Sequence, residues 1–368
     1  MLTVLQIRVC EDELMKYLQL AQVCKINMGQ SPESSTYNDN GDGLPFFQGN
    51  ADFGEMHPVT RIWCKAPTKV AQAGDILITV RAPIGAMNYA SEKCCIGRGL
   101  AAITPNSAHV FSEYIYWLLK SKNKELNSKG TGSTFKAIGK KVLEEIQVPC
   151  ICMKEQKEYV AVLRSAYEVV KLRRSQLKSL DNLIKARFVE MFGNQESNTY
   201  GWQQSTIGET CTLKSGTSLP ADVENEGGPI PYVKVGDMNY PGNERYITTS
   251  SRFITVQTAG KGLFPVGSIL FPKRGGAIGT NKKRMTTLPV CADLNVMGVS
   301  SNGCLVPDYL MAYFEMLDLG SLDNGSSVPQ INNKDIAPLR ICVPPLKLQK
   351  EFSVFVSQVD KSKIVVLE

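Results

Sequence analysis

The chain carries one series of short sequence signals twice. Strand, turn and helix-start signals between Tyr17 and Pro149 return in the same order between Trp202 and Pro344. Matching signals lie 186 to 195 residues apart, so short loop insertions account for the drift. A period of tens of residues is typical of solenoids, but this one has the size of a domain. We therefore predict a tandem duplication into two similar domains. The matching segments are 20–29 and 207–216, 45–46 and 231–232, 74–77 and 267–270, 80–85 and 273–279, 132–138 and 325–331, 146–149 and 341–344, and 156–159 and 349–352.

The composition is that of a folded protein. With 368 residues and 43% hydrophobic residues, the chain can form two domains with their own cores. No apolar run approaches the roughly 20 residues that span a bilayer, and the acidic residues at 11–13 do not fit a signal peptide. We therefore expect a cytoplasmic protein without a membrane partner. The net charge of +6 is compatible with a nucleic-acid partner but does not establish one.

The sequence lacks the usual combinations of catalytic and metal-binding residues. It has eleven cysteines without a Cys-x-x-Cys pair, and its two histidines, His57 and His109, both lie in the first copy. A zinc site would need an unusual ligand set, and a duplicated enzyme would be expected to repeat its catalytic groups. The glycine-rich stretches 132–141 and 275–279 lack the spacing or the following helix of a phosphate loop. We therefore predict no catalytic, metal-binding or cofactor-binding residue, and reduced, mostly buried thiols.

Each copy shows the pattern of short strands and turns with one internal helix. The run 75–80 is apolar and β-branched, and glycine and proline residues bound it. Helices are expected at about 112–127 and 308–319. The predicted fold class is α+β, with two similar, mostly β domains joined by two long helices. The predicted organisation is an N-terminal segment at 1–16 that packs on the helical region, a first domain at 17–152, a central spacer helix at 153–193, a second domain at 194–345 and a shortened helix at 346–368.

Residues 154–192 predict a long helix, because they contain neither proline nor glycine and repeat apolar residues every seven positions. At about 1.5 Å per residue this helix would be on the order of 58 Å long, which favours a spacer over an amphipathic helix lying on one core. The helix that ends the second copy is a natural partner in an antiparallel intramolecular coiled coil. The predicted seam comprises Tyr159, Leu163, Ala166, Val170, Leu177, Leu180, Ile184 and Met191 in the central helix, and Phe352, Val356 and Val359 in the last helix.

Basic and amide side chains recur in the loops of both copies. Arginine and lysine suit guanine edges and phosphates, and asparagine and glutamine suit adenine edges. The adjacent cations Lys282, Lys283 and Arg284 are the strongest candidates for phosphate contacts. The candidate DNA-binding residues are Gln30, Gln48, Asn50, Arg81, Arg98, Lys129 and Lys136 in the first copy, and Lys234, Asn239, Lys273, Arg274, Asn281, Lys282, Lys283, Arg284 and Gln330 in the second.

Two weakly similar domains joined by long helices resemble the specificity (S) subunit of Type I restriction–modification systems. The resemblance covers nearly the whole chain and rests on the repeated domain endings. These are a Gly-Ser pair before Ile138 and before Ile331, the Ile-x-Val-Pro strands that end at Pro149 and Pro344, and the glutamine–lysine pairs 156–157 and 349–350 that open the long helices.

The resemblance implies a non-catalytic reader of double-stranded DNA with two target-recognition domains. Each domain would read one half of a bipartite site, and the helices would set the gap between the halves. It also implies two modification subunits on the helical region, with S-adenosylmethionine and adenine methylation, and restriction subunits that use ATP and Mg²⁺ as translocase and nuclease. The second helix is short for the family pattern, so residues 1–16 are expected to supply the missing part.

Two other functions fit the sequence. One is the recognition subunit of a related system whose methylase and nuclease share one polypeptide, which neighbouring genes would distinguish. The other is a structural adaptor with two protein-binding domains on a coiled coil, which would show no salt-dependent affinity for a DNA duplex.

Overall fold

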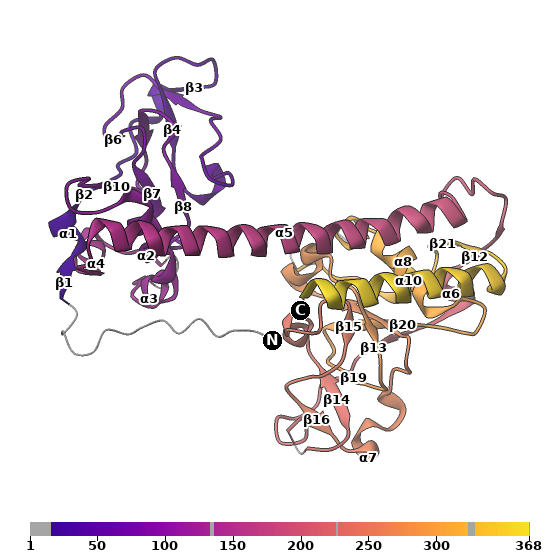
Figure 1. Cartoon of the computed structure of the whole chain (residues 1–368). Coiled ribbons are helices and arrows are strands. Elements are labelled where there is room, and N and C mark those ends of the chain that lie inside the picture. Colours follow the sequence, from indigo (N-terminus) through magenta and orange to yellow (C-terminus); the bar gives the residue numbers. More distant parts are fainter. Residues whose placement is uncertain (1–15, 133–135, 226, 323–327, 368) are drawn as a thin grey trace. The chain divides into compact units, whose positions relative to one another are not determined.

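The computed structural model describes residues 16–132, 136–225, 227–322 and 328–367. The chain divides into two compact units, residues 1–170 and 171–368. Each unit combines small β-sheets with short helices, which confirms the predicted α+β class (Figure 1). The long helix α5 (Met153–Phe192) begins in unit 1 and ends in unit 2. No described helix is long and apolar enough to cross a membrane.

Unit 1 contains three sheets, with strand orders β1-β11, β2-β10-β7-β8 and β3-β5-β4-β9-β6. The strands are β1 (Tyr17–Gln19), β2 (Cys24–Met28), β3 (Tyr37–Asn38), β4 (Leu44–Phe47), β5 (Trp63–Cys64), β6 (Val70–Ala71), β7 (Ile76–Thr79), β8 (Met87–Tyr89), β9 (Cys94–Ile96), β10 (Leu100–Pro105) and β11 (Gln147–Pro149). The short helices are α1 (Leu20–Val23), η1 (Ser34–Thr36), η2 (Asn50–Asp52), α2 (Ser112–Ser121), α3 (Asn123–Ser128) and α4 (Lys140–Glu144). The single helix expected at 112–127 is thus two helices, because the backbone leaves helical geometry at Lys122 (ψ 3°).

Unit 2 repeats this arrangement with sheets β12-β21, β13-β20-β17-β18-β15 and β16-β14-β19. The strands are β12 (Gln203–Thr206), β13 (Cys211–Ser215), β14 (Ile230–Val233), β15 (Tyr246–Ile247), β16 (Phe253–Ile254), β17 (Ile269–Pro272), β18 (Arg284–Thr286), β19 (Cys291–Ala292), β20 (Val296–Ser301) and β21 (Arg340–Val343). The helices are α6 (Ile207–Thr210), η3 (Val235–Asn239), α7 (Val256–Ala259), η4 (Gly260–Gly262), η5 (Gly275–Thr280), α8 (Pro307–Met316), η6 (Leu319–Leu322), α9 (Asn333–Ile336) and α10 (Leu346–Leu367).

The repeated glycines Gly29 and Gly216 occupy the same close backbone approach in the two units. Gly29 N donates to Leu100 O and Gly216 N donates to Val296 O, both at 2.9 Å. A Cβ atom at Gly29 would lie 2.2 Å from the carbonyl oxygen of Gly97, and one at Gly216 would lie 2.2 Å from that of Ala292. Only glycine fits where two backbones meet this closely, which explains why the duplication kept both residues.

We expect Gly216→Ala to lower the free energy of unfolding of unit 2 by about 3 kcal/mol, because the new methyl group forces two backbone segments apart. Gly276→Ala is the matched control, since a Cβ atom there would meet no atom within 4 Å. Urea denaturation followed by circular dichroism measures both. Equal effects of the two variants would show that the close approach does not exist in solution.

In unit 1, α5 packs on α2 through the face that carries Gln156, Val160 and Tyr167. Val160 is buried in the main core of the unit. Tyr167 packs edge-on against Trp117 of α2, with ring centroids 5.4 Å apart. The first half of α5 therefore contacts the core of unit 1 through a different face from the predicted coiled-coil seam.

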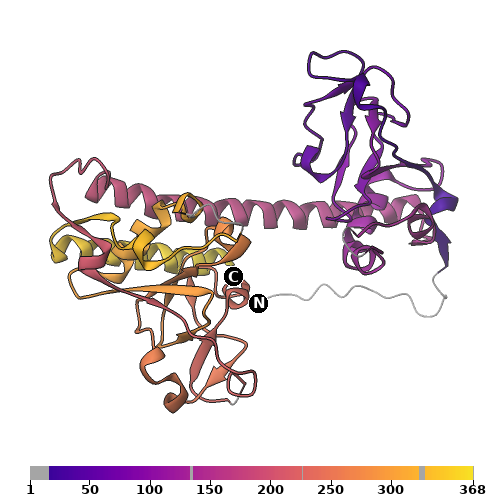
Figure 2. The same cartoon turned by 180° about the vertical axis from the view of Figure 1, so that it is seen from behind.

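In unit 2, α10 runs antiparallel to the second half of α5, as Figures 1 and 2 both show. The ring of Phe352 lies 5.6 Å from that of Phe188, centroid to centroid, near the start of α10. Further along α10, Lys363 Nζ lies 2.8 Å from the carboxylate of Asp181. Since Lys363 follows Phe352 while Asp181 precedes Phe188, the two helices run in opposite directions, as predicted.

The predicted seam packs in its unit 2 portion and is exposed in unit 1. Ile184, Phe352, Val356 and Val359 are buried in one core, and Leu180 and Met191 pack against it. Leu177 is half-buried, and Tyr159, Leu163, Ala166 and Val170 are exposed. The physical reason is that α10 lies along α5 only near residues 181–192. The predicted packing of segment 1–16 falls on residues outside the described ranges, except for Lys16.

Candidate nucleic-acid interface

The two units hold one loop cluster with the same backbone hydrogen bonds. In unit 1, Val80 N donates to Gly99 O and Ile138 N donates to Val80 O, both at 2.9 Å. In unit 2, Lys273 N donates to Asn295 O and Ile331 N donates to Lys273 O, also at 2.9 Å. We call the segments that these bonds connect the strand-end loops. They comprise 80–81, 97–99 and 136–138 in unit 1 and 273–274, 293–295 and 329–331 in unit 2. The matching bonds make the loops of the two units equivalent.

The strand-end loops of unit 1 carry three exposed cations. Arg81 pairs with Ala137 in an isolated β-bridge, and Ala82 N donates to Lys136 O at 3.0 Å, so the backbones at Arg81 and Lys136 are neighbours. Arg98 lies in the adjacent loop, where its amide donates to Ser31 Oγ. Arg81, Arg98 and Lys136 are all exposed. The structure therefore gathers three of the predicted residues into one cationic region.

Two predicted glutamines, Gln30 and Gln48, lie beside these loops. Gln30 N donates to Ile96 O at 3.0 Å, just before the loop that holds Arg98. The backbone of Gln48 passes so close to Gly99 that a Cβ there would lie 2.1 Å from Gln48 O. Both glutamine side chains are exposed. Amide groups and guanidinium groups thus occur together, the combination that base edges and phosphates require.

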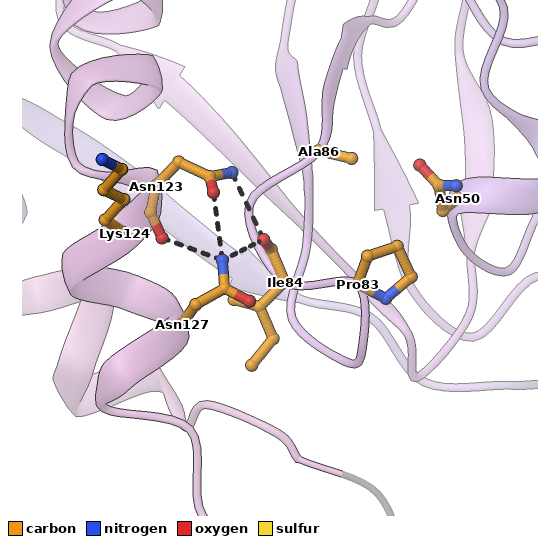
Figure 3. A pocket seen from close by; sticks show the side chains of 7 residues that line it. All are labelled: Asn50, Pro83, Ile84, Ala86, Asn123, Lys124 and Asn127. Atoms are coloured by element: carbon orange, nitrogen blue, oxygen red, sulfur yellow. Dashed lines mark hydrogen bonds between the residues drawn. The ribbon is translucent and has the colours of Figure 1, made fainter. Parts of the chain in front are cut away.

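A hollow of about 530 Å³ lies between η2 and α3 (Figure 3). Asn50 lines one side, Asn123, Lys124 and Asn127 line the other, and Pro83, Ile84 and Ala86 line it between them. Asn123 and Asn127 both donate to Ile84 O, so these two amides hold the turn that follows Arg81. The sequence reading selected Asn50 but missed Asn123, Lys124 and Asn127. Their i, i+4 asparagine spacing on a short helix was the available signal.

Lys129, which the sequence predicted as a DNA contact, forms an ion pair with a carboxylate of α3. Its ammonium group lies 2.7 Å from the carboxylate of Glu125, one turn earlier in α3. Lys122 shares the same carboxylate, and the two lysines hold the pKa of Glu125 below its usual value. Lys129 is exposed, so the pair is a surface ion pair of small energy.

In unit 2 the equivalent loops present a different set of side chains. Arg274 is exposed and forms a β-bridge with Gln330, as Arg81 does with Ala137. Lys273 is half-buried and its ammonium donates to Ser215 Oγ at 2.9 Å. Burial and the neighbouring Arg274 charge lower the pKa of Lys273. The Gln330 amide donates to Asn332 Oδ1 at 2.8 Å.

The run from Lys282 to Arg284 does not form the cationic surface that its sequence predicts. Lys283 is buried, and its ammonium donates to Leu317 O and to Asn281 Oδ1, both at 2.7 Å. Burial lowers the pKa of Lys283 to about 8. Arg284 is half-buried and donates to the carbonyl oxygens of Met238 and Lys283. These hydrogen bonds hold the Lys283 and Arg284 side chains against the unit, so phosphate contact by Lys283 is no longer expected.

The remaining unit 2 candidates also have partners within the protein. Lys234 pairs with the buried carboxylate of Glu224 at 2.5 Å, and Arg252 approaches the same carboxylate at 3.3 Å. Lys282 donates to Asn239 Oδ1. Of the predicted cations of unit 2, Arg274 alone among the described residues is both exposed and without a protein ion pair in this structure.

Thiols and acidic residues form no metal site within the described ranges. The ten described cysteines are all unpaired, and Cys150 and Cys152 are the exposed ones among them. Burial raises the pKa of Cys24 and of Cys94 to about 12, so these thiols stay protonated and unreactive at neutral pH.

The fold and its loops define a protein of two homologous domains that share one scaffold and differ in their loop side chains. The family model for the type I restriction modification DNA specificity domain matches the chain twice, at residues 12–182 and 200–367. The chain therefore belongs to this family of specificity domains.

Two proteins of Methanocaldococcus jannaschii are similar to this chain. The first is named "Putative type I restriction enzyme MjaX specificity subunit"; it is 40% identical over 161 residues, which are 44% of this chain and 38% of that protein. The second, the type I restriction enzyme MjaIX specificity subunit, is 24% identical over 81% of this chain and 74% of its own length. The match to the first thus spans well under half of that relative.

A solved structure shares the fold over nearly the whole chain. The crystal structure of the type I restriction–modification S subunit from M. genitalium is 15% identical and covers 97% of this chain and 92% of its own, with a TM-score of 0.52. At that identity the likeness concerns the fold alone.

Proposed function

We propose that this chain is the sequence-specific DNA-binding subunit of a Type I restriction–modification complex, with one half-site read by each unit. The observation that carries the proposal is the pair of equivalent strand-end loops. Identical backbone hydrogen bonds hold Arg81 and Arg274 at matching positions. Around them the side chains differ, with Ala137 in unit 1 where unit 2 has Gln330. One scaffold with a shared cation and different neighbours suits two half-sites of different sequence.

The proposal places the chemistry in partner subunits. Two modification subunits would bind the helical region and carry S-adenosylmethionine for adenine methylation, and restriction subunits would use ATP and Mg²⁺. This chain would supply DNA recognition and no catalytic residue. The adaptor alternative finds less support, because an exposed arginine lies at the equivalent strand-end loop of each unit and two further exposed cations lie beside Arg81 in unit 1, which suits a polyanionic ligand.

Exchange of residues 17–152 for the corresponding domain of another such subunit tests the assignment. We expect the methylated site to change in one half only, because the loops of unit 2 are untouched. Methylation mapping by long-read sequencing of cells that express the chimera with its genomic partners measures both halves. A site changed in both halves, or in neither, would contradict independent reading by the two units.

Insertion of seven residues just before Leu177 tests the spacer. Residues 168–176 of α5 are exposed, and the contact with α10 begins near Asp181, so the insertion should leave both packed regions intact. Seven residues lengthen a helix by about 10 Å, or roughly three base pairs of duplex. We expect the gap in the recognised site to change while both half-sites stay the same. An unchanged gap would show that the helix does not set it.

A further inference from the structure

Each long helix is bonded to its own domain by a buried glutamine side chain. Gln156 lies in the first turn of α5 and is 1% exposed, and Gln349 lies in the first turn of α10 and is 0% exposed. Glutamine is mostly exposed in proteins, and burying its amide is unfavourable unless the donors and acceptor are bonded. Two such residues at equivalent positions therefore point to a specific role.

In unit 1 the amide of Gln156 makes three hydrogen bonds to two other segments of the domain. Its Oε1 accepts from Phe111 N at 2.7 Å, and Phe111 is the N-cap of α2. Its Nε2 donates to His109 O at 3.3 Å and to Ile151 O at 3.0 Å. One side chain thus connects the long helix, the loop before α2 and the turn between β11 and α5.

In unit 2 the amide of Gln349 repeats these bonds one for one. Its Oε1 accepts from Val306 N at 2.8 Å, and Val306 is the N-cap of α8. Its Nε2 donates to Cys304 O at 3.1 Å and to Pro344 O at 2.8 Å. The contacted segments also match: Ile151 lies in the turn between β11 and α5, and Pro344 lies in the turn between β21 and α10.

A tyrosine at equivalent positions completes each arrangement. Tyr114 Oη donates to Pro149 O at 3.3 Å, and Tyr309 Oη donates to Cys342 O at 2.8 Å. Both tyrosines lie in the first turn of the helix that the glutamine caps. We call Gln156 with Tyr114 the unit 1 joint, and Gln349 with Tyr309 the unit 2 joint.

We propose that Gln156 and Gln349 are positioning residues that make the complex discriminate the gap between half-sites; this rests on the proposed function. A helix of 40 residues is about 60 Å long, so a tilt of about 5° at the joint displaces its far end by about 5 Å. That displacement exceeds the rise of one base pair, about 3.4 Å. Gap discrimination to one base pair therefore needs a stiff joint, and the fully bonded amide supplies it.

The test is a Gln156→Met variant in the assembled complex. Methionine has a similar length and removes all three hydrogen bonds. Methylation rates are measured on duplexes with both half-sites fixed and the gap varied by one base pair at a time. We expect the ratio of rates at the preferred and neighbouring gaps to fall by roughly tenfold, the factor that a lost buried hydrogen bond represents. Preference for the half-site sequences should not change.

Two further variants separate positioning from loss of stability. Ile103→Val shortens a buried side chain of β10, so it should lower the melting temperature and leave the gap ratio as in the wild type. Tyr114→Phe removes one hydroxyl from the joint and keeps the ring, so it should fold and broaden the gap preference less than Gln156→Met. If neither joint variant alters the gap ratio, or if both slow methylation equally at every gap, the proposal is wrong. A wild-type complex without sequence-specific methylation would instead refute the proposed function.

Discussion

Replacing Phe352 with alanine is expected to lower the free energy of unfolding of unit 2 by about 4 kcal/mol. The Phe352 ring is fully buried in α10, with ring centroids 5.6 Å from Phe188 and 5.5 Å from Phe192 of α5. Truncating a buried phenylalanine loses its transfer free energy and leaves a cavity, which together cost about 3–5 kcal/mol. Urea denaturation measures the change by circular dichroism and by tryptophan emission, to which unit 2 contributes Trp202, whose indole donates to Phe192 O.

Val354→Ala is the matched control on the same helix. Val354 is 60% exposed, so its truncation should change the free energy of unfolding by less than about 0.5 kcal/mol. A Phe352→Ala effect as small as that of the control would mean that α10 does not pack on α5 in solution. The antiparallel pairing described for unit 2 would then be incorrect.

Substituting Arg81 and Arg274 together with methionine is expected to weaken DNA binding on the order of a hundredfold. Both guanidinium groups are exposed at the equivalent strand-end loops. If each contacts a phosphate, the slope of log affinity against log salt should lose about two units of magnitude. Fluorescence anisotropy of the assembled complex with a labelled duplex, over a series of salt concentrations, gives affinity and slope together.

Two lysine variants are the controls for this experiment. Lys283→Met should leave the salt slope unchanged, because the Lys283 ammonium is buried and bonded to Leu317 O. Lys141→Met removes a charge whose side chain is 84% exposed on α4, outside the strand-end loops, and should also leave it unchanged. An unaltered slope in the double arginine variant would show that DNA contacts a different surface.

The strand-end loops show why sequence reasoning found only part of the candidate site. Arg81 and Arg274 were predictable, because each follows a strand signal at matching places in the duplication. Lys283 was not, since its inward direction depends on where β18 begins and on the Leu317 carbonyl, 34 residues away. Asn123 and Asn127 were missed for a similar reason: their partner Ile84 lies about forty residues earlier.

For the long helices, too, the sequence predicted one part and the tertiary structure decided the other. The seven-residue period is a local property of the chain, so it predicted α5 and its apolar positions. Whether a given position is covered depends on what lies beside it. Phe352 and Tyr159 match in the repeat, yet Phe352 is buried and Tyr159 is 52% exposed. Only the tertiary structure decides this, because burial requires a partner that the period does not encode.

The sequence by itself determined that one domain is present twice and that a long helix follows the first copy, and its repeated domain endings resemble those of DNA specificity subunits. Those conclusions rest on local signals: turn glycines, strand endings and helix periodicity. The tertiary structure decided which cations face solvent, which half of the helical seam is packed, and that Gln156 and Gln349 bond each helix to its domain. These depend on hydrogen bonds and burial between residues distant in sequence, which local patterns do not specify.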